Sequence, residues 1–415
     1  MVLAACGGGG SSTPDPVVVL PPVVVTPPVV DDSETPNILL IISDDQGLDA
    51  SAQYSYSSDL PTTPNLNQLA DDGLVFENAW ATPACTTTRA TLITGKYAVN
   101  TGVTFVPAML SDEHQILQQY LATNTASQSY ASAVFGKWHL GGGNADASHP
   151  NDLGVDYYAG SLSNISDYYD WDLTINGQTE SSTVYHTTKV TDLAADWISQ
   201  QSTPWFAWVA YSAPHSPFHL PPATLHNRVL SGTTADINNN RRDYYLAAIE
   251  AMDAEIGRLI AGLDDAVREN TTIIFMGDNG TPGRVIDTSV YAQDHGKGSL
   301  YQGGVSVPML ISGAGVTRQG ERDTTLVSAT DLYATIGEIA GIEQPSIHDS
   351  NSFAAILDST SNTNNSAPII FTQFESINTT GSTARNAIYK LIQFVDGTTE
   401  LYSLDGMIDE GNDVS

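Results

Sequence analysis

The chain has 415 residues, of which 41% are hydrophobic, enough to bury the core of one large α/β domain with an appendage or of two domains. Its formal net charge of −32 argues against nucleic acid and anionic membrane surfaces as partners, because such binding needs clustered Lys and Arg. Only 15 residues are Lys or Arg, and five of these are Lys, so a basic residue inside a motif stands out.

Residues 1–36 are predicted to be a lipoprotein-like N-terminus and a flexible linker, and not part of a folded domain. Leu3-Ala4-Ala5-Cys6, followed by four glycines, resembles the cleavage site of a bacterial lipoprotein with Cys6 as the lipid-accepting residue, although the usual basic and apolar stretch before it is missing. Gly, Ser, Pro and Val then alternate, as in a semi-extended linker. We expect an exported protein, a periplasmic or cell-surface lipoprotein of a Gram-negative bacterium, with a cytosolic chain as the alternative.

Four short apolar runs are typical of strands buried on both faces of a parallel sheet. The runs are Asn37–Ile42, Ala131–Phe135, Phe206–Tyr211 and Thr271–Met276. The polar residues that follow them are Asp44 and Asp45, Lys137 and His139, His215, and Asp278 and Asn279. Open α/β sheets place their sites at the carboxyl ends of parallel strands. A shared rim therefore explains the four cases better than four separate solvated turns.

Helical patterns lie between these strands. Apolar residues of Tyr244–Leu263 recur at spacings of three, four and seven, and Asp331–Ile342 is similar, as expected for amphipathic helices. Strands that alternate with helices predict an α/β domain with a largely parallel sheet over residues 37–360.

The pattern changes in residues 361–415, where strands follow one another closely. Pro368–Phe371, Asn386–Phe394 and Thr398–Leu404 are separated by polar turns. They predict a small antiparallel C-terminal subdomain.

A candidate nucleophile lies in Cys85-Thr86-Thr87-Thr88-Arg89, just before the helix-compatible run Ala90–Ile93. A nucleophile at a helix N-terminus meets unpaired N–H groups and the positive end of the dipole, which suits an anionic substrate. Arg89 would add a cation matched to tetrahedral oxyanions. A single cysteine is more often a small hydrophobic residue than a nucleophile. This stretch by itself is therefore weak evidence for catalysis, and the other motifs strengthen it.

Taken together, the motifs resemble the formylglycine-dependent sulfatases of the alkaline-phosphatase superfamily, from Asn37 to about Leu404. The resemblance rests on Asn37–Ile41 with Asp44-Asp45, Cys85–Arg89 with Thr94-Gly95-Lys96-Tyr97, Gly136-Lys137-Trp138-His139-Leu140-Gly141, Pro214-His215, Gly277-Asp278-Asn279-Gly280, and Gly296-Lys297 to Tyr301 with Gly303-Gly304 and Val307-Pro308. It implies an alkaline-phosphatase-like mixed, largely parallel sheet flanked by helices, with a small C-terminal antiparallel portion.

The resemblance also implies roles for individual residues. Asp44, Asp45, Asp278 and Asn279 would ligate a divalent cation, and an all-oxygen donor set favours Ca²⁺ or Mg²⁺. Cys85 would be converted to formylglycine by a formylglycine-generating maturase. The residues around the nucleophile and the sulfate would be Arg89, Lys137, His139, His215 and Lys297.

The implied reaction is hydrolysis of a sulfate ester, on a sulfated carbohydrate or an aryl sulfate. It needs fixed positive charge, a metal and a proton donor, and three of the rare cations lie inside the motifs. One hydroxyl of the hydrated aldehyde would attack sulfur, and after the alcohol leaves the second would expel sulfate. His139 or His215 would be the general acid, and the resemblance favours His215.

Three residues depart from the family pattern. Thr87 stands where the maturation signal usually has Pro or Ala, Thr88 where Ser is frequent, and Gln302 where Glu is often found. Two other functions therefore stay open beside the sulfatase. One is a phosphoester or phosphonate hydrolase that uses Cys85 or a neighbouring threonine directly, and the other is a non-catalytic binder of sulfated glycans. Specificity for the leaving group would come from loops 144–188 and 219–240.

Overall fold

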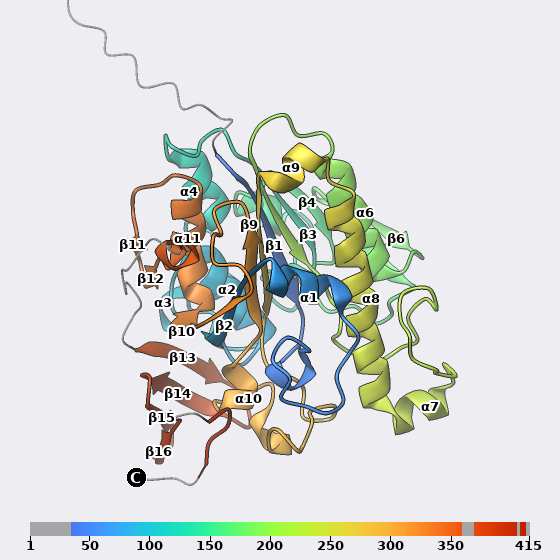
Figure 1. The fold of residues 1–415 in the computed structure, drawn as a ribbon, viewed down its shortest axis with the longest axis vertical. Coiled ribbons are helices and arrows are strands. Elements are labelled where there is room, and N and C mark those ends of the chain that lie inside the picture. The colour runs from blue at the N-terminus through green and yellow to red at the C-terminus, as the bar shows by residue number, and fades with distance from the viewer. Residues whose placement is uncertain (1–34, 359–368, 405–406, 412–415) are drawn as a thin grey trace, which may run out of the picture. The chain divides into compact units, whose positions relative to one another are not determined.

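A ten-stranded mixed sheet forms the centre of the structure, a computed structural model that describes residues 35–358, 369–404 and 407–411 (Figure 1). Its strands are β1 (Asn37–Ser43), β2 (Gly73–Trp80), β3 (Ala131–Gly136), β4 (Tyr157–Gly160), β5 (Trp171–Ile175), β6 (Gln178–Ser182), β7 (Trp205–Ala210), β8 (Thr271–Gly277), β9 (Met309–Gly313) and β10 (Glu321–Ser328). They lie in the order β10-β2-β9-β8-β1-β7-β3-β4-β5-β6.

The central strands β8, β1, β7, β3 and β4 run parallel, whereas β9 is antiparallel to both β8 and β2. The register places Ser43 opposite Gly277 and Ala210 opposite both Ile42 and Gly136. All four predicted strands are therefore confirmed, and they end at the same edge of the sheet.

Helices cover both faces of this sheet (Figure 1). They are α1 (Pro64–Asp71), α2 (Cys85–Thr94), α3 (Ala98–Thr101), α4 (Leu117–Thr123), α5 (His149–Asp152), α6 (His186–Ile198), α7 (Thr234–Asn239), α8 (Arg241–Ala261), α9 (Asp265–Glu269), α10 (Gln302–Val305) and α11 (Leu332–Ile339). Helices α1, α6 and α8 pack on one face, and α2, α4 and α11 lie on the other. Within the described ranges, no helix combines the length and the apolar character needed to cross a bilayer.

Burial on both faces explains why the first strand is an unbroken apolar run. Leu39 and Ile41 of β1 join the core under α6 and α8, whereas Ile38, Leu40 and Ile42 join the core under α2, α4 and α11. Successive side chains of a strand point to opposite faces, so a polar residue at any of these positions would face one of the two cores.

Both predicted amphipathic helices are present. The helix expected over 244–263 is α8, which begins three residues earlier, at Arg241, and ends at Ala261. The one expected over 331–342 is α11, which follows a short 3₁₀ turn at Ala329–Asp331 and runs from Leu332 to Ile339. Gly341 has a φ of 88°, in the left-handed region, and this conformation ends the helical path of the chain.

The small C-terminal antiparallel sheet is also confirmed, and it contains one strand that the sequence pattern did not indicate. Its strands are β13 (Ile370–Glu375), β14 (Thr380–Arg385), β15 (Tyr389–Phe394) and β16 (Thr399–Ser403), in that order. The missed strand, β14, reads Thr-Gly-Ser-Thr-Ala-Arg and lacks apolar alternation. Cys6 and Pro368 lie outside the described residues, and the domain boundaries at 36 and 360 stay predictions.

A buried ion pair ties this small sheet to the rest of the chain. The Nζ atom of Lys390 on β15 donates to Glu410 Oε1 at 2.5 Å, and both side chains are fully buried. Glu410 also accepts from the backbone N–H of Gln302, the first residue of α10, at 2.7 and 3.0 Å. The ammonium lies 4.9 Å from the centre of the Trp80 ring, within cation–π range. The C-terminal segment thereby connects β15, α10 and β2.

Glu410→Ala should lower the free energy of unfolding by about 3–5 kcal/mol, because it leaves the Lys390 ammonium buried without its carboxylate. Equilibrium urea denaturation measures this. Glu343→Ala is the control, since Glu343 is exposed and its loss should change stability by less than about 0.5 kcal/mol. Equal midpoints for the two variants would show that the buried pair does not stabilise the fold.

Candidate active site

The four predicted metal ligands meet at the edge where β1 and β8 end. Asp278 donates its backbone N–H to Ser43 O at 3.0 Å, and Asp45 donates its own to Asp278 Oδ1 at 3.0 Å. Asn279 Nδ2 donates to Asp45 Oδ1 at 2.9 Å. Asp45 itself has a φ of 71°, in the left-handed region. Asp44, Asp45, Asp278 and Asn279 are all buried.

Each of the three predicted cations forms an ion pair with one of these carboxylates. The pairs are Lys137 with Asp44, Arg89 with Asp278 at 2.9 Å, and Lys297 with Asp45. Arg89 is 1% exposed and also donates to Lys137 O at 2.6 Å, which connects α2 to the end of β3. Burial would lower the pKa of Lys297, but the charge of Asp45 raises it above its usual value. Lys297 is therefore an ammonium at neutral pH.

Two oxygens of the cluster are suited to a cation. Asp44 Oδ1 and Asn279 Oδ1 are buried, and neither has a hydrogen-bond partner among the described residues. A buried polar oxygen without a partner is costly, and carboxylate and amide oxygens are the ligands that Ca²⁺ and Mg²⁺ take in proteins. A ligand atom of Asp44 and one of Asp278 also lie within 4.8 Å of each other. The residues present thus fit a divalent cation.

The pKa shifts of Asp278 and Asp44 also favour a divalent cation at this cluster. Burial and the charge of Asp44 raise the pKa of Asp278, although Arg89 opposes this. Burial would also raise the pKa of Asp44, but the charges of Lys137, His215 and Arg89 bring it below its usual value. A divalent cation between the two carboxylates would remove their repulsion.

Cys85 is the first residue of α2, as expected for a nucleophile at a helix N-terminus. Its Sγ lies 3.3 Å from His139 Nδ1. Burial raises the pKa of the thiol, so it is protonated at neutral pH and is a poor nucleophile as it stands. Burial, Lys137 and Arg89 lower the pKa of His139 to about 2, which keeps its imidazole neutral.

His215 follows β7 and reaches the cluster beside Asp45. Its Nε2 lies 3.7 Å from Asp45 Oδ2, and its Nδ1 lies 2.6 Å from Ser216 O. The hydroxyl of Tyr168 donates to Ser212 O and His215 O, each at 2.7 Å, and so holds the turn. Burial lowers the pKa of His215. Every predicted site residue is therefore brought to one place.

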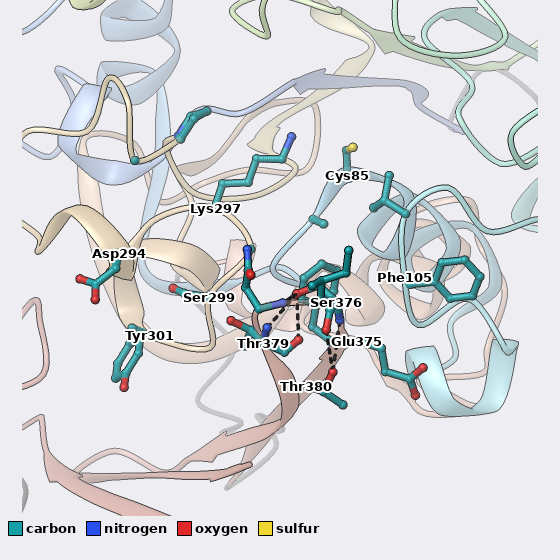
Figure 2. A pocket seen from close by; sticks show the side chains of 18 of the residues that line it. Cys85, Phe105, Asp294, Lys297, Ser299, Tyr301, Glu375, Ser376, Thr379 and Thr380 are labelled. Carbon is teal, nitrogen blue, oxygen red and sulfur yellow. Dashed lines mark hydrogen bonds between the residues drawn. The ribbon is translucent and has the colours of Figure 1, made fainter. Parts of the chain in front are cut away.

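A cleft of about 1690 Å³ opens over Cys85 and Lys297. Its walls are the segment Phe105–Val106, the loops Pro282–Arg284 and Gln293–Tyr301, and the turn between β13 and β14 from Phe374 to Thr380. Figure 2 shows the side chain of Lys297 extended towards Cys85, with Ser376 and Thr379 of the turn facing the same cleft.

The loops expected to set specificity contribute little to this cleft. Asn164 is the residue that they supply to it, within the described ranges. The aromatic residues of loop 144–188 pack against one another instead: the ring of Tyr168 stacks on His219 at 3.8 Å, and Tyr169 lies near it at 6.3 Å. Trp171 lines a separate pocket of about 500 Å³. The contribution of these two loops to specificity stays a prediction.

A second set of residues, which the sequence did not indicate, holds the loop after β1. Tyr245 on α8 donates its hydroxyl to Asp45 O at 2.8 Å. Asp49 accepts from the Thr281 hydroxyl at 2.5 Å and from Arg242 at 3.2 Å. Tyr245 and Arg242 look like ordinary residues of an amphipathic helix, so nothing in the sequence signalled these contacts.

Comparison with known proteins agrees with this geometry. The family model described as Sulfatase matches residues 36–342. N-acetylgalactosamine-6-sulfatase of Sus scrofa is 28% identical over 354 residues, which are 75% of this chain. The chain spans only 63% of the length of that relative. A sulfatase of Formosa agariphila is 26% identical over 474 residues, which cover 90% of this chain and 83% of the relative.

A solved structure extends the likeness to three dimensions. The crystal structure of Ps i-CgsB in complex with k-i-k-neocarrahexaose has a TM-score of 0.75 and is 26% identical, covering 92% of this chain and 89% of that one. The family match includes every residue of the carboxylate and cation cluster. The chain belongs to the sulfatase family.

Proposed function

We propose that the protein hydrolyses sulfate esters, with residue 85 in its formylglycine form as the nucleophile. The observation that carries the proposal is the convergence of Arg89, Lys137 and Lys297 on the carboxylate cluster beside Cys85. A sulfate ester needs fixed cations around a nucleophile, and these side chains are held in position before the substrate arrives. Burial raises the pKa of the Cys85 thiol, which disfavours direct attack by sulfur.

Asp44, Asp45, Asp278 and Asn279 would hold a divalent cation, Ca²⁺ in our proposal with Mg²⁺ as the alternative. When bound, that ion would act as a Lewis acid on a sulfate oxygen. Lys137 and Lys297 would bind the remaining sulfate oxygens, since each ammonium is already directed into the cluster.

Two histidines are proposed to move protons. His139 Nδ1 lies 3.3 Å from Cys85 Sγ, so it is within reach of residue 85 and would accept a proton from that residue as it attacks sulfur. His215 would protonate the departing oxygen, since its Nε2 lies at the cluster, 3.7 Å from Asp45 Oδ2. This division leaves the two proton transfers on separate side chains.

The proposed substrate is a sulfated carbohydrate, with aryl sulfates as test substrates. A cleft of about 1690 Å³ exceeds the roughly 300–1,000 Å³ usual for small-molecule pockets. We further propose that the protein is exported, that a maturase converts Cys85, and that Cys6 carries a lipid anchor in a Gram-negative envelope. These proposals rest on the sequence around Cys6 and Cys85.

Purified protein should cleave an aryl sulfate much faster than the matching aryl phosphate. Lys297→Ala should lower the sulfatase rate by about 10²–10³, because one preorganised charge-stabilising group is lost. Release of the phenol, followed by absorbance, measures both. Lys189→Ala is the control, since Lys189 lies on α6 outside the cleft. A preference for phosphate would contradict the proposed reaction.

Removal of divalent cations should abolish turnover and lower the melting temperature, because the buried carboxylates then repel one another. Returning Ca²⁺ at a hundred times its dissociation constant should restore about 2.7 kcal/mol of stability. Differential scanning calorimetry with and without chelator measures the change. In Asn279→Ala, which lacks one of the unpartnered oxygens, the same addition of Ca²⁺ should have a smaller effect. Identical melting of wild type with and without chelator would exclude a resident cation.

Mass spectrometry of the peptide containing residue 85 should find formylglycine, with conversion incomplete in a foreign host because Thr87 replaces Pro or Ala. Thr87→Pro should raise the converted fraction and activity together. Thr87 lies in the first turn of α2, where its backbone N–H has no partner within the helix and proline is tolerated. The change removes the buried Thr87 hydroxyl, which donates to Ala84 O at 2.8 Å, whereas the Thr82 hydroxyl keeps its hydrogen bond to Thr88 at 2.7 Å. An alkylatable thiol at residue 85 in fully active protein would rule out the formylglycine route.

A further inference from the structure

Arg284 differs from most cations of this chain. Arg228, Arg242, Arg258, Arg268, Arg318 and Arg322 each pair with a carboxylate. Arg284 is exposed and lines the cleft, and within the described ranges no hydrogen bond or ion pair engages its guanidinium. In a chain with 47 acidic residues and 15 basic ones, an arginine that lines the cleft and has no carboxylate partner among the described residues is available to bind an anion.

The backbone under Arg284 is packed against the loop that carries Lys297. Lys297 donates its N–H to Thr281 O at 3.0 Å. A Cβ on Gly283 would lie 2.3 Å from Gln293 O, and one on Gly296 would lie 2.3 Å from Thr281 O, so these two loops touch backbone to backbone. The guanidinium therefore extends from a segment that is fixed relative to the reacting centre.

The turn that contains Arg284 is held on its other side as well. Val285 and Ile286 both donate their N–H groups to Pro282 O, at 2.9 and 3.0 Å. Their side chains are buried, which anchors the turn in the core below the cleft. Arg284 is the residue of this turn that projects outwards with a charge.

The cleft has room for more than the group that carries the reacting sulfate. Its opposite wall is the turn between β13 and β14, with Phe374, Ser376 and Thr380, and Phe105 closes a further side. Asp294 and Glu375 also line it (Figure 2). These carboxylates disfavour an anion beside them, and Arg284 and Lys297 are the basic residues among those that line the cleft.

We propose that Arg284 binds a second anionic group of the substrate, a sulfate or a carboxylate, on the unit next to the sulfate ester that is cleaved. The inference rests on the proposed sulfatase function and specifies its substrate class as a polyanionic oligosaccharide. A guanidinium presents two parallel N–H donors, which match the oxygens of either anion. Arg284 would thus set which sulfate of a multiply charged chain reaches residue 85.

Calorimetric binding to a Cys85→Ala background tests this without turnover. The probes are a disaccharide sulfated on the ring that wild-type protein desulfates, and the same disaccharide with a second sulfate, or with a carboxylate, on the adjoining ring. The second anion should strengthen binding, and adding Arg284→Gln should lower the affinity for the probe with two anions roughly tenfold. Rising salt should shrink the advantage, because the contact is exposed.

Two further variants control the measurement. Arg284→Lys keeps the charge without the planar fork and should retain part of the advantage. Arg241→Gln removes another exposed arginine, which lies at the start of α8 outside the cleft. This variant should leave the affinity gained from the second anion unchanged. The sulfate and carboxylate probes identify which anion the site takes.

The outcomes separate this inference from the proposed function. If wild-type protein desulfates the probes but the second anion gives no advantage, or the advantage survives Arg284→Gln, the inference is overturned and the function stands. If wild-type protein cleaves no sulfate ester at all, the proposed function fails and the inference fails with it. Loss of the advantage in Arg284→Gln alone supports the inference.

Discussion

Parallel pairing of β1 with β7 on one side and β8 on the other is the constraint on which the site depends. This register ends the strands together, so that Asp44, Lys137 and Asp278 leave the sheet at one edge. A shift by one residue would turn every side chain of β1 to the opposite face. Because helices bury both faces, such a shift would have to repack two cores at once. The positions of Asp44, Lys137 and Asp278 therefore depend on the apolar packing of the two cores.

Charge balance shows what a bound divalent cation would add to the site. Three carboxylates, Asp44, Asp45 and Asp278, are paired with three cations, so the formal charges of these six groups cancel. Buried pairs of this kind contribute little net stability, since desolvation offsets their attraction. A divalent cation added to a neutral cluster makes it positive. In a protein of net charge −32, a bound divalent cation would make this the place that attracts the proposed anionic substrate.

The proposed chemistry and the proposed recognition would be supplied by different parts of the chain. The cluster and the nucleophile come from the ends of central strands and from α2, whereas one wall of the cleft is the turn between β13 and β14 of the small C-terminal sheet. The Lys390–Glu410 pair and its bond to Gln302 connect that sheet to α10, which follows the Lys297 loop. Under the proposed function, changes in the turn would alter which substrate enters without disturbing the cluster.

The sequence by itself determined the buried strands, the helix at Cys85 and the grouping of Asp44, Lys137, His215 and Asp278. These follow from local information, because an unbroken apolar run predicts a strand covered on both faces, and parallel strands end at a common edge. Conversion of Cys85 and the role of each site residue remain predictions.

Only the tertiary structure decided which cation pairs with which carboxylate, that Tyr245 and Arg242 support the loop after β1, and that β14 exists. It alone placed the β13–β14 turn and Arg284 around one cleft. These features depend on contacts between segments far apart along the chain, made by residues without periodicity or motif. Their proximity is set by how the helices and sheets pack, and packing leaves no local pattern in the sequence.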